Sequence, residues 1–172
     1  MVYIIDTLCA LVFIMSFFYD TSVLGYSEST GMINRVTYMF AHASLIHFII
    51  NMVSFNMLAR AIKGGRGVAI GVVSAVAATF GSEMSIPTVG LSGVIYAMLG
   101  YIFALNPRCK SYNMALLLAV AVNIALSFIV SSSNCTVHLL SLAYGAALTF
   151  IINKLYNYGK KCKFQQSADS KP

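Results

Sequence analysis

The stretch GLSGVIYAMLGYIFALNP, residues 90–107, contains no charged side chain and decides the fold class. Residues 91–105 are almost entirely apolar, and Asn106-Pro107 ends the run. A helix that crosses a bilayer needs roughly 20 mostly apolar residues, so this segment is a slightly short candidate. It predicts a membrane helix that begins with the Gly-Leu-Ser-Gly sequence.

The composition of the whole chain agrees with this interpretation. Of its 172 residues, 59% are hydrophobic and only 9% are charged, whereas soluble domains carry about 25% charged residues. The net charge of +6 does not indicate nucleic-acid binding, because the basic residues fall in short loops and the tail. We expect all four cysteines to be free thiols, since they are widely scattered: Cys9, Cys109, Cys135 and Cys162.

The apolar runs predict an all-α membrane protein, a six-transmembrane-helix bundle over residues 1–158, followed by a disordered cytoplasmic tail at 159–172. We expect non-helical backbone buried at membrane depth at residues 81–90. The first segment lacks the basic region of a signal peptide, so we expect it to be retained. The six predicted spans are 2–19, 42–62, 67–82, 91–105, 113–130 and 137–156.

The distribution of basic residues predicts the orientation. With a cytoplasmic N-terminus, ten of the 11 Lys and Arg residues fall in inner loops or the tail, and only Arg35 is outside. Cytoplasmic loops are enriched in Lys and Arg. We therefore expect a multi-pass protein with both termini in the cytoplasm. A bacterial plasma membrane is our default, because the chain is minimal and has no organelle presequence.

All three histidines, His42, His47 and His138, lie in or at the ends of predicted spans, where polar groups are costly and often functional. On a helix, His47 and Asn51 lie about 40° apart, whereas His42 and His47 diverge by about 140°. We therefore expect His42 to face away from the site that His47 and Asn51 share.

The predicted topology places four polar residues in the outer leaflet: Ser92, His138, His47 and Asn51. A serine becomes a nucleophile when a base takes its proton, and His138 has a suitable ordinary pKa. His47, Asn51 and the Ser92 N–H would stabilise an oxyanion. Asp6 lies at the opposite face and Glu83 in a loop, so we predict a Ser–His dyad.

Three motifs, in order, resemble those of rhomboid intramembrane serine proteases, over roughly residues 33–150. Residues 42–51, HASLIHFIIN, are similar to the H-x4-H-x3-N signature. Residues 90–97, GLSGVIYA, match G-x-S-G with a tyrosine four residues after the serine. His138 and Gly145 resemble the H-x6-G pattern of the last helix.

By that resemblance, Ser92 is the nucleophile and His138 the general base, while His47 and Asn51 line the oxyanion hole. Tyr96 would pack on the His138 ring. Glycines would allow the helices of the site to approach closely. Independently of the resemblance, we expect His42 to be structural and to hold the outer loop. The supporting glycines are Gly90, Gly93 and Gly145. The resemblance also implies a substrate gate formed by the helix at 113–130 and a loop, at 106–112 or 131–136. We favour 131–136 as the cap, because residues 106–112 are cytoplasmic in the predicted topology.

The chain also departs from the family. Val137 and Ser141 stand where many relatives have Ala and Gly, and Asn134 replaces a common Gly. The Trp-Arg pair of the first outer loop is absent, although Asn34-Arg35 stands nearby.

The resemblance implies cleavage of transmembrane segments of client membrane proteins near the outer leaflet, by a monomer or weak dimer. It implies no metal, no cofactor and no nucleic acid. One alternative is a catalytically inactive rhomboid-like protein that binds transmembrane clients. A metal site of three histidines is disfavoured by the divergence of His42 and the lack of carboxylates. A channel would show a polar stripe along one helix, which is not seen.

Overall fold

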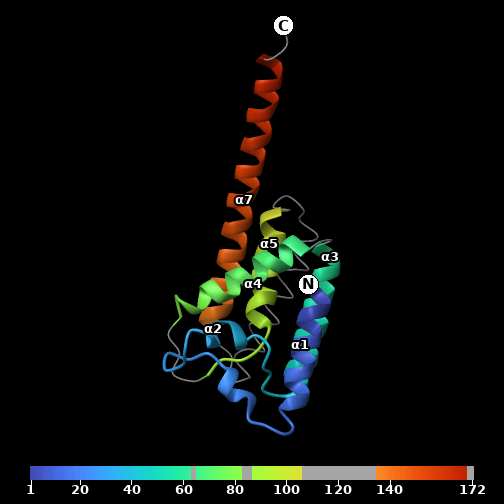
Figure 1. Ribbon diagram of the computed structural model, residues 1–172, viewed down its shortest axis with the longest axis vertical. Helices are drawn as coiled ribbons and strands as arrows, with labels where there is room; N and C mark the ends of the chain where they lie inside the picture. Colours follow the sequence, from blue (N-terminus) through green and yellow to red (C-terminus); the bar gives the residue numbers. More distant parts are fainter. Residues whose placement is uncertain (63–64, 83–86, 106–134, 170–172) are drawn as a thin grey trace.

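The computed structural model describes residues 1–62, 65–82, 87–105 and 135–169, with side chains to residue 156. Apart from one isolated bridge between Tyr26 and Thr88, the regular elements in these ranges are helices, so the all-α prediction is confirmed there. The span predicted at 113–130 and the cap at 131–136 lie outside the described residues. The elements are α1 (Val2–Met15), the short 3-10 helix η1 (Thr21–Leu24), α2 (Asn34–Thr37), α3 (Leu45–Ile62), α4 (Gly65–Thr79), α5 (Ser92–Leu105) and α7 (Cys135–Asp169) (Figure 1).

Two described helices are long and apolar enough to cross a membrane, namely α3 and residues Cys135–Tyr156 of α7. The helices α1, α4 and α5 are apolar but shorter than a full span. Large apolar side chains such as Tyr3, Ile46 and Phe150 are exposed on the outer faces of the bundle. Such a surface suits lipid better than water.

Helix α3 begins at Leu45, and the predicted start at residue 42 is wrong. The Ser44 hydroxyl accepts a hydrogen bond from the His47 N–H at 3.2 Å, which is the geometry of an N-cap. Helix α1 likewise ends at Met15 instead of residue 19. There the Ser16 hydroxyl donates to the Phe13 carbonyl at 2.6 Å, within a turn that closes the helix.

Helix α7 continues to Asp169, so the segment predicted to be disordered from residue 159 is helical over most of its length. No proline interrupts residues 157–169, which are rich in Lys and Gln. Both residue types have high helix propensity. The polar and basic composition of this segment is therefore compatible with a helix that extends beyond the apolar part of α7 (Figure 1).

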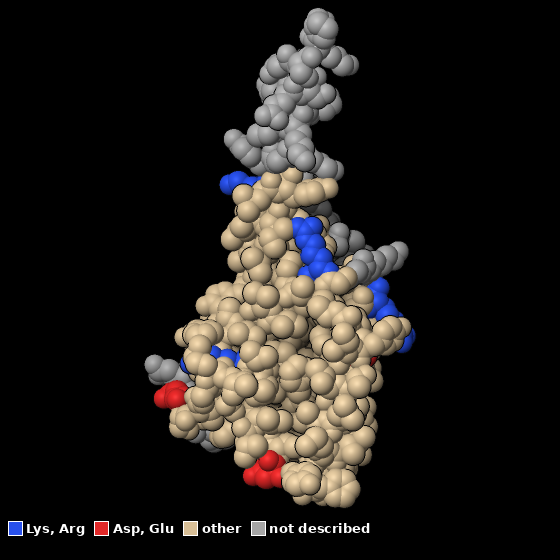
Figure 2. All heavy atoms as spheres, in the orientation of Figure 1, with Lys and Arg blue, Asp and Glu red and all other residues tan. Residues whose placement is uncertain are grey.

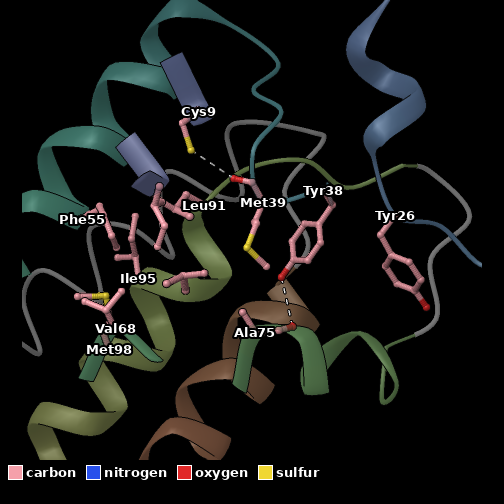
Figure 3. Packing of buried hydrophobic residues seen from close by; sticks show 12 residues of the cluster. Cys9, Tyr26, Tyr38, Met39, Phe55, Val68, Ala75, Leu91, Ile95 and Met98 are labelled. Atoms are coloured by element: carbon pink, nitrogen blue, oxygen red, sulfur yellow. Dashed lines mark hydrogen bonds between the residues drawn. The ribbon is translucent and has the colours of Figure 1, made fainter. Parts of the chain in front are cut away.

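Helix α5 occupies the centre of the bundle and packs mainly against α4 and α7. Ten consecutive residues of α5, from Gly93 to Ile102, are buried. Figure 3 shows how Leu91, Ile95 and Met98 lie against side chains from α1, α3, α4 and the loop after α2. The central place of α5 explains why its sequence is apolar on every face.

Charged side chains are distributed unevenly along the bundle. In Figure 2, Lys and Arg side chains gather mostly over its upper part, and Asp and Glu side chains lie mainly on its lower part. The first residues of α3, α5 and α7 are at the lower end in the same orientation (Figure 1). The N-terminal ends of these three helices therefore meet at the less basic end of the molecule.

Arg35 of α2 connects the loop after α1 to the end of α4. Its guanidinium donates to the Thr79 carbonyl at 2.7 Å and to the Thr79 hydroxyl at 3.2 Å. The same group lies 4.6 Å from the centre of the Tyr26 ring and 4.2 Å from that of Phe80. A cation at a helix C-terminus compensates for carbonyls that have no partner within the helix.

We expect Arg35→Ala to lower the free energy of unfolding by about 2 kcal/mol, because it removes two stacking contacts and a charge-assisted hydrogen bond. Thermal unfolding of the purified protein in detergent micelles would measure the loss. Arg35→Lys should recover only part of it, since an ammonium cannot stack between two rings as a planar guanidinium does. Equal stability of the wild type and Arg35→Ala would contradict this account.

Candidate active site

Ser92 is the first residue of α5 and follows a turn at Gly90. Gly90 has a φ of +123°, a conformation that side-chain-bearing residues rarely adopt. A Cβ on Gly90 would lie 2.7 Å from Cε1 of His47 and 2.8 Å from its Nε2. Glycine is therefore required here twice, once for the backbone conformation and once for the space that the His47 ring occupies.

His138 lies in the first turn of α7 and is 7% exposed. Its Nε2 is 2.7 Å from Oγ of Ser92, a hydrogen-bond distance. The ring of Tyr96, one turn further along α5 than Ser92, stacks on the His138 ring with centroids 4.5 Å apart and planes 8° from parallel. The hydrogen bond and the stacked ring together restrain the imidazole on two sides.

Two glycines on facing helices allow α5 and α7 to touch along their backbones. A Cβ on Gly145 of α7 would overlap the carbonyl oxygen of Ala97, and one on Gly100 of α5 would overlap that of Leu142. Small residues permit such close helix packing in membranes. This contact holds the start of α5 beside the start of α7, and so holds Ser92 beside His138.

His47 lies in the first turn of α3 and faces the same region. The position that a Gly90 Cβ would occupy is 2.8 Å from His47 Nε2 and 3.8 Å from Ser92 Oγ. The other ring nitrogen, Nδ1, is buried without a hydrogen-bond partner among the described residues. The His47 ring is thus close enough to Ser92 for both to contact one small group.

Asn51 is 3% exposed and lies one turn after His47 on α3. Its side-chain nitrogen donates to the His47 carbonyl at 2.8 Å. Its side-chain oxygen has no partner within the described part of the chain. In this conformation the amide supports the turn that carries His47 through one of its two N–H groups.

The divergence of about 140° predicted between His42 and His47 is wrong. His42 precedes the Ser44 cap and is not part of α3, so the 140° divergence of a continuous helix does not apply. The two imidazole rings lie edge to face with centroids 5.4 Å apart. His42 also meets the ring of Phe48 at 5.3 Å, and its Nδ1 is 3.2 Å from the Phe40 carbonyl. The His42 ring therefore packs against the His47 ring.

Two residues that the sequence did not single out for the site also reach it. Tyr38 accepts a hydrogen bond from the Gly90 N–H through its carbonyl, at 2.9 Å, and its hydroxyl lies 2.7 Å from where a Gly93 Cβ would be. The Ser141 hydroxyl, fully buried on α7, is 3.4 Å from the same point. Gly93 is the feature of the sequence that could have indicated these two contacts, because a glycine inside a buried helix often marks the close approach of another group.

Of the two acids considered for orienting His138, only Asp6 lies within the described residues. Asp6 accepts a hydrogen bond from the Asn56 amide at 3.0 Å, between α1 and α3. Glu83 lies outside the described residues. Within the described ranges, no three His, Cys, Asp or Glu side chains come close enough together to hold a metal ion.

Comparison with known proteins agrees with the motifs. A family model described as Rhomboid domain matches residues 29–155, about three quarters of the chain, from the loop before α2 to the apolar part of α7. No curated protein matches the sequence significantly. The matched region contains Ser92, His138, His47 and Asn51, and membership of this family implies an integral membrane protein. The chain therefore belongs to the rhomboid family.

Proposed function

We propose that this protein is an intramembrane serine endopeptidase that cleaves transmembrane segments of client membrane proteins. The observation that carries the proposal is the 2.7 Å contact between Ser92 Oγ and His138 Nε2, at the start of α5 and in the first turn of α7. A serine paired in this way with an imidazole has the geometry required of an activated nucleophile. Membership of the rhomboid family, which generally consists of such proteases, supports the same reaction.

In the proposed reaction, Ser92 Oγ attacks the carbonyl carbon of the scissile peptide bond while His138 Nε2 takes the serine proton. The tetrahedral intermediate then collapses, the C–N bond breaks, and His138 gives the proton to the leaving amine. His138 then takes a proton from water, which attacks the ester carbonyl, and gives that proton to Ser92 Oγ as the ester C–O bond breaks and the acid product leaves. This cycle needs no cofactor, and the imidazole returns to its starting protonation state.

The negative oxygen of the intermediate would be stabilised beside Gly90. The first N–H groups of α5, including that of Ser92, have no partner within the helix and would donate to the oxyanion. His47 Nε2 lies near the same space and would donate as well. We assign Asn51 to the same oxyanion site. One of its N–H groups holds the His47 carbonyl, and the second N–H would donate to the oxyanion.

The proposal includes six membrane spans, cytoplasmic termini, a bacterial plasma membrane and cleavage near the outer leaflet. The orientation is supported by the bias of basic side chains toward one end of the bundle (Figure 2) and by the start of α5, which is Ser92, toward the other end (Figure 1). The client helix would have to unwind locally, since a peptide bond inside a helix is hydrogen-bonded and sterically shielded.

Proteoliposomes that contain the purified protein and a single-span model substrate would test this function. We expect two fragments, with the cut mapped by mass spectrometry to the outer part of the span, and no effect of a chelator. The alternative is an inactive member of the family that binds clients. Co-purification of the uncleaved substrate, with no fragments at any enzyme concentration, would favour that alternative.

A further inference from the structure

Tyr38, which follows α2, links three parts of the bundle although it belongs to no long helix. It is 1% exposed. Figure 3 shows its ring pointing from the loop toward α4, where its hydroxyl donates to the Ala75 carbonyl at 3.2 Å. The residue is therefore anchored at both ends, by its backbone in the loop and by its hydroxyl on α4.

The backbone of Tyr38 acts on the turn that carries the proposed nucleophile. Its carbonyl accepts the hydrogen bond of the Gly90 N–H at 2.9 Å. Gly90 holds an unusual positive φ, only two residues before Ser92. A conformation of this kind persists when its surroundings impose it, and the bond to Tyr38 is one such restraint.

The hydroxyl of Tyr38 contacts the residue that follows Ser92 in the sequence. It lies 2.7 Å from the position of a Cβ on Gly93, the residue directly after Ser92. No methyl group could share that space. The hydroxyl therefore fills the gap that glycine leaves at the start of α5, and connects this start to Ala75 of α4.

We infer that Tyr38 is a positioning residue for the nucleophile, which it orients by holding Gly90 through its carbonyl and by filling the space over Gly93 with its hydroxyl. This inference rests on the proposed protease function. Tyr38 acts through its two glycine neighbours and does not contact the scissile bond. A loss of the hydroxyl frees the ring to shift, and the carbonyl that holds the Gly90 turn shifts with it.

The first test is Tyr38→Phe, assayed with the single-span substrate in proteoliposomes. We expect kcat to fall about tenfold with KM unchanged, because a displacement well below 1 Å at a nucleophile is already costly. Tyr26→Phe is the matched control. The Tyr26 hydroxyl is also buried and donates to an α4 carbonyl, that of Thr79 at 2.9 Å, but it lies away from Gly93. We expect Tyr26→Phe to keep kcat at a similar thermal stability.

The second test uses the contact between the Tyr38 hydroxyl and Gly93. Gly93→Ala should be almost inactive, since its methyl would press on that hydroxyl. The two next-nearest atoms to this methyl, Ala75 Cβ and Ser141 Oγ, lie at 3.4 Å, which is an ordinary contact. The double variant Tyr38→Phe/Gly93→Ala should therefore recover to about the activity of Tyr38→Phe alone, a non-additive result that shows direct coupling.

The results separate the two proposals. An active wild type with equal kcat in Tyr38→Phe, or a double variant as inactive as Gly93→Ala, would overturn the role of Tyr38 and leave the protease function standing. A wild type that neither cleaves the substrate nor reacts with a fluorophosphonate probe at Ser92 would overturn both. Reaction with this small probe, which needs no client helix, should slow in Tyr38→Phe in parallel with kcat.

Discussion

Replacing Ser92 with alanine is expected to reduce cleavage of a single-span substrate by at least about 10³-fold, because no other group in the proposed reaction can form the ester intermediate. The change removes one oxygen atom from a half-buried position. The stacking of Tyr96 on His138 does not depend on that atom, so the fold should be retained. Initial rates in proteoliposomes, with thermal unfolding measured on the same preparation, would give both quantities.

Ser74→Ala is the matched control for this prediction. Ser74 is a buried serine of α4 whose hydroxyl has no hydrogen-bond partner among the described residues. Removing such a hydroxyl is close to neutral, so the variant should cleave at the wild-type rate. Cleavage that survives in Ser92→Ala would identify a different nucleophile or a contaminating protease. Loss of cleavage in both variants would point to an unspecific effect on folding.

The second large effect is expected for Gly145→Val. A Cβ at this position would overlap the carbonyl oxygen of Ala97, and a clash with backbone cannot be relieved by a change of rotamer. Helices α5 and α7 would have to separate. The 2.7 Å contact between Ser92 and His138 would then be lost, and we expect cleavage to fall by about 10²-fold or more.

The same substitution should lower the free energy of unfolding by about 3 kcal/mol, at the upper end of the range for overpacking. Ala147→Val is the control, since it places the same residue on an exposed position of α7 two residues later. We expect that variant to match the wild type in thermal unfolding and in cleavage. A Gly145→Val protein with wild-type stability and activity would show that the backbone contact of α5 and α7 is unimportant.

The amino-acid sequence by itself determined the all-helical membrane class, the family and the residues that carry the proposed chemistry. A long uncharged apolar run indicates directly that a helix is surrounded by lipid. The spacing of a motif such as residues 90–97 can be read from the sequence without knowledge of how the helices pack. It also placed the starts of the helices that carry Ser92, His138 and His47 at one end of the bundle. The class, the family and the site residues depend on local sequence, and the shared end of the helix starts follows from the distribution of basic residues along the chain.

The tertiary structure decided which side chains meet there. A capping hydrogen bond at Ser44 moved His42 off α3 and brought its ring to that of His47, which no helical wheel drawn from residue 42 could indicate. The role inferred for Tyr38 depends on Gly90, Gly93 and Ala75, residues 37 or more positions away in the chain. Helical periodicity carries no information on such distant contacts, because they arise from the path of a loop and from backbones that approach closely only where glycine leaves space.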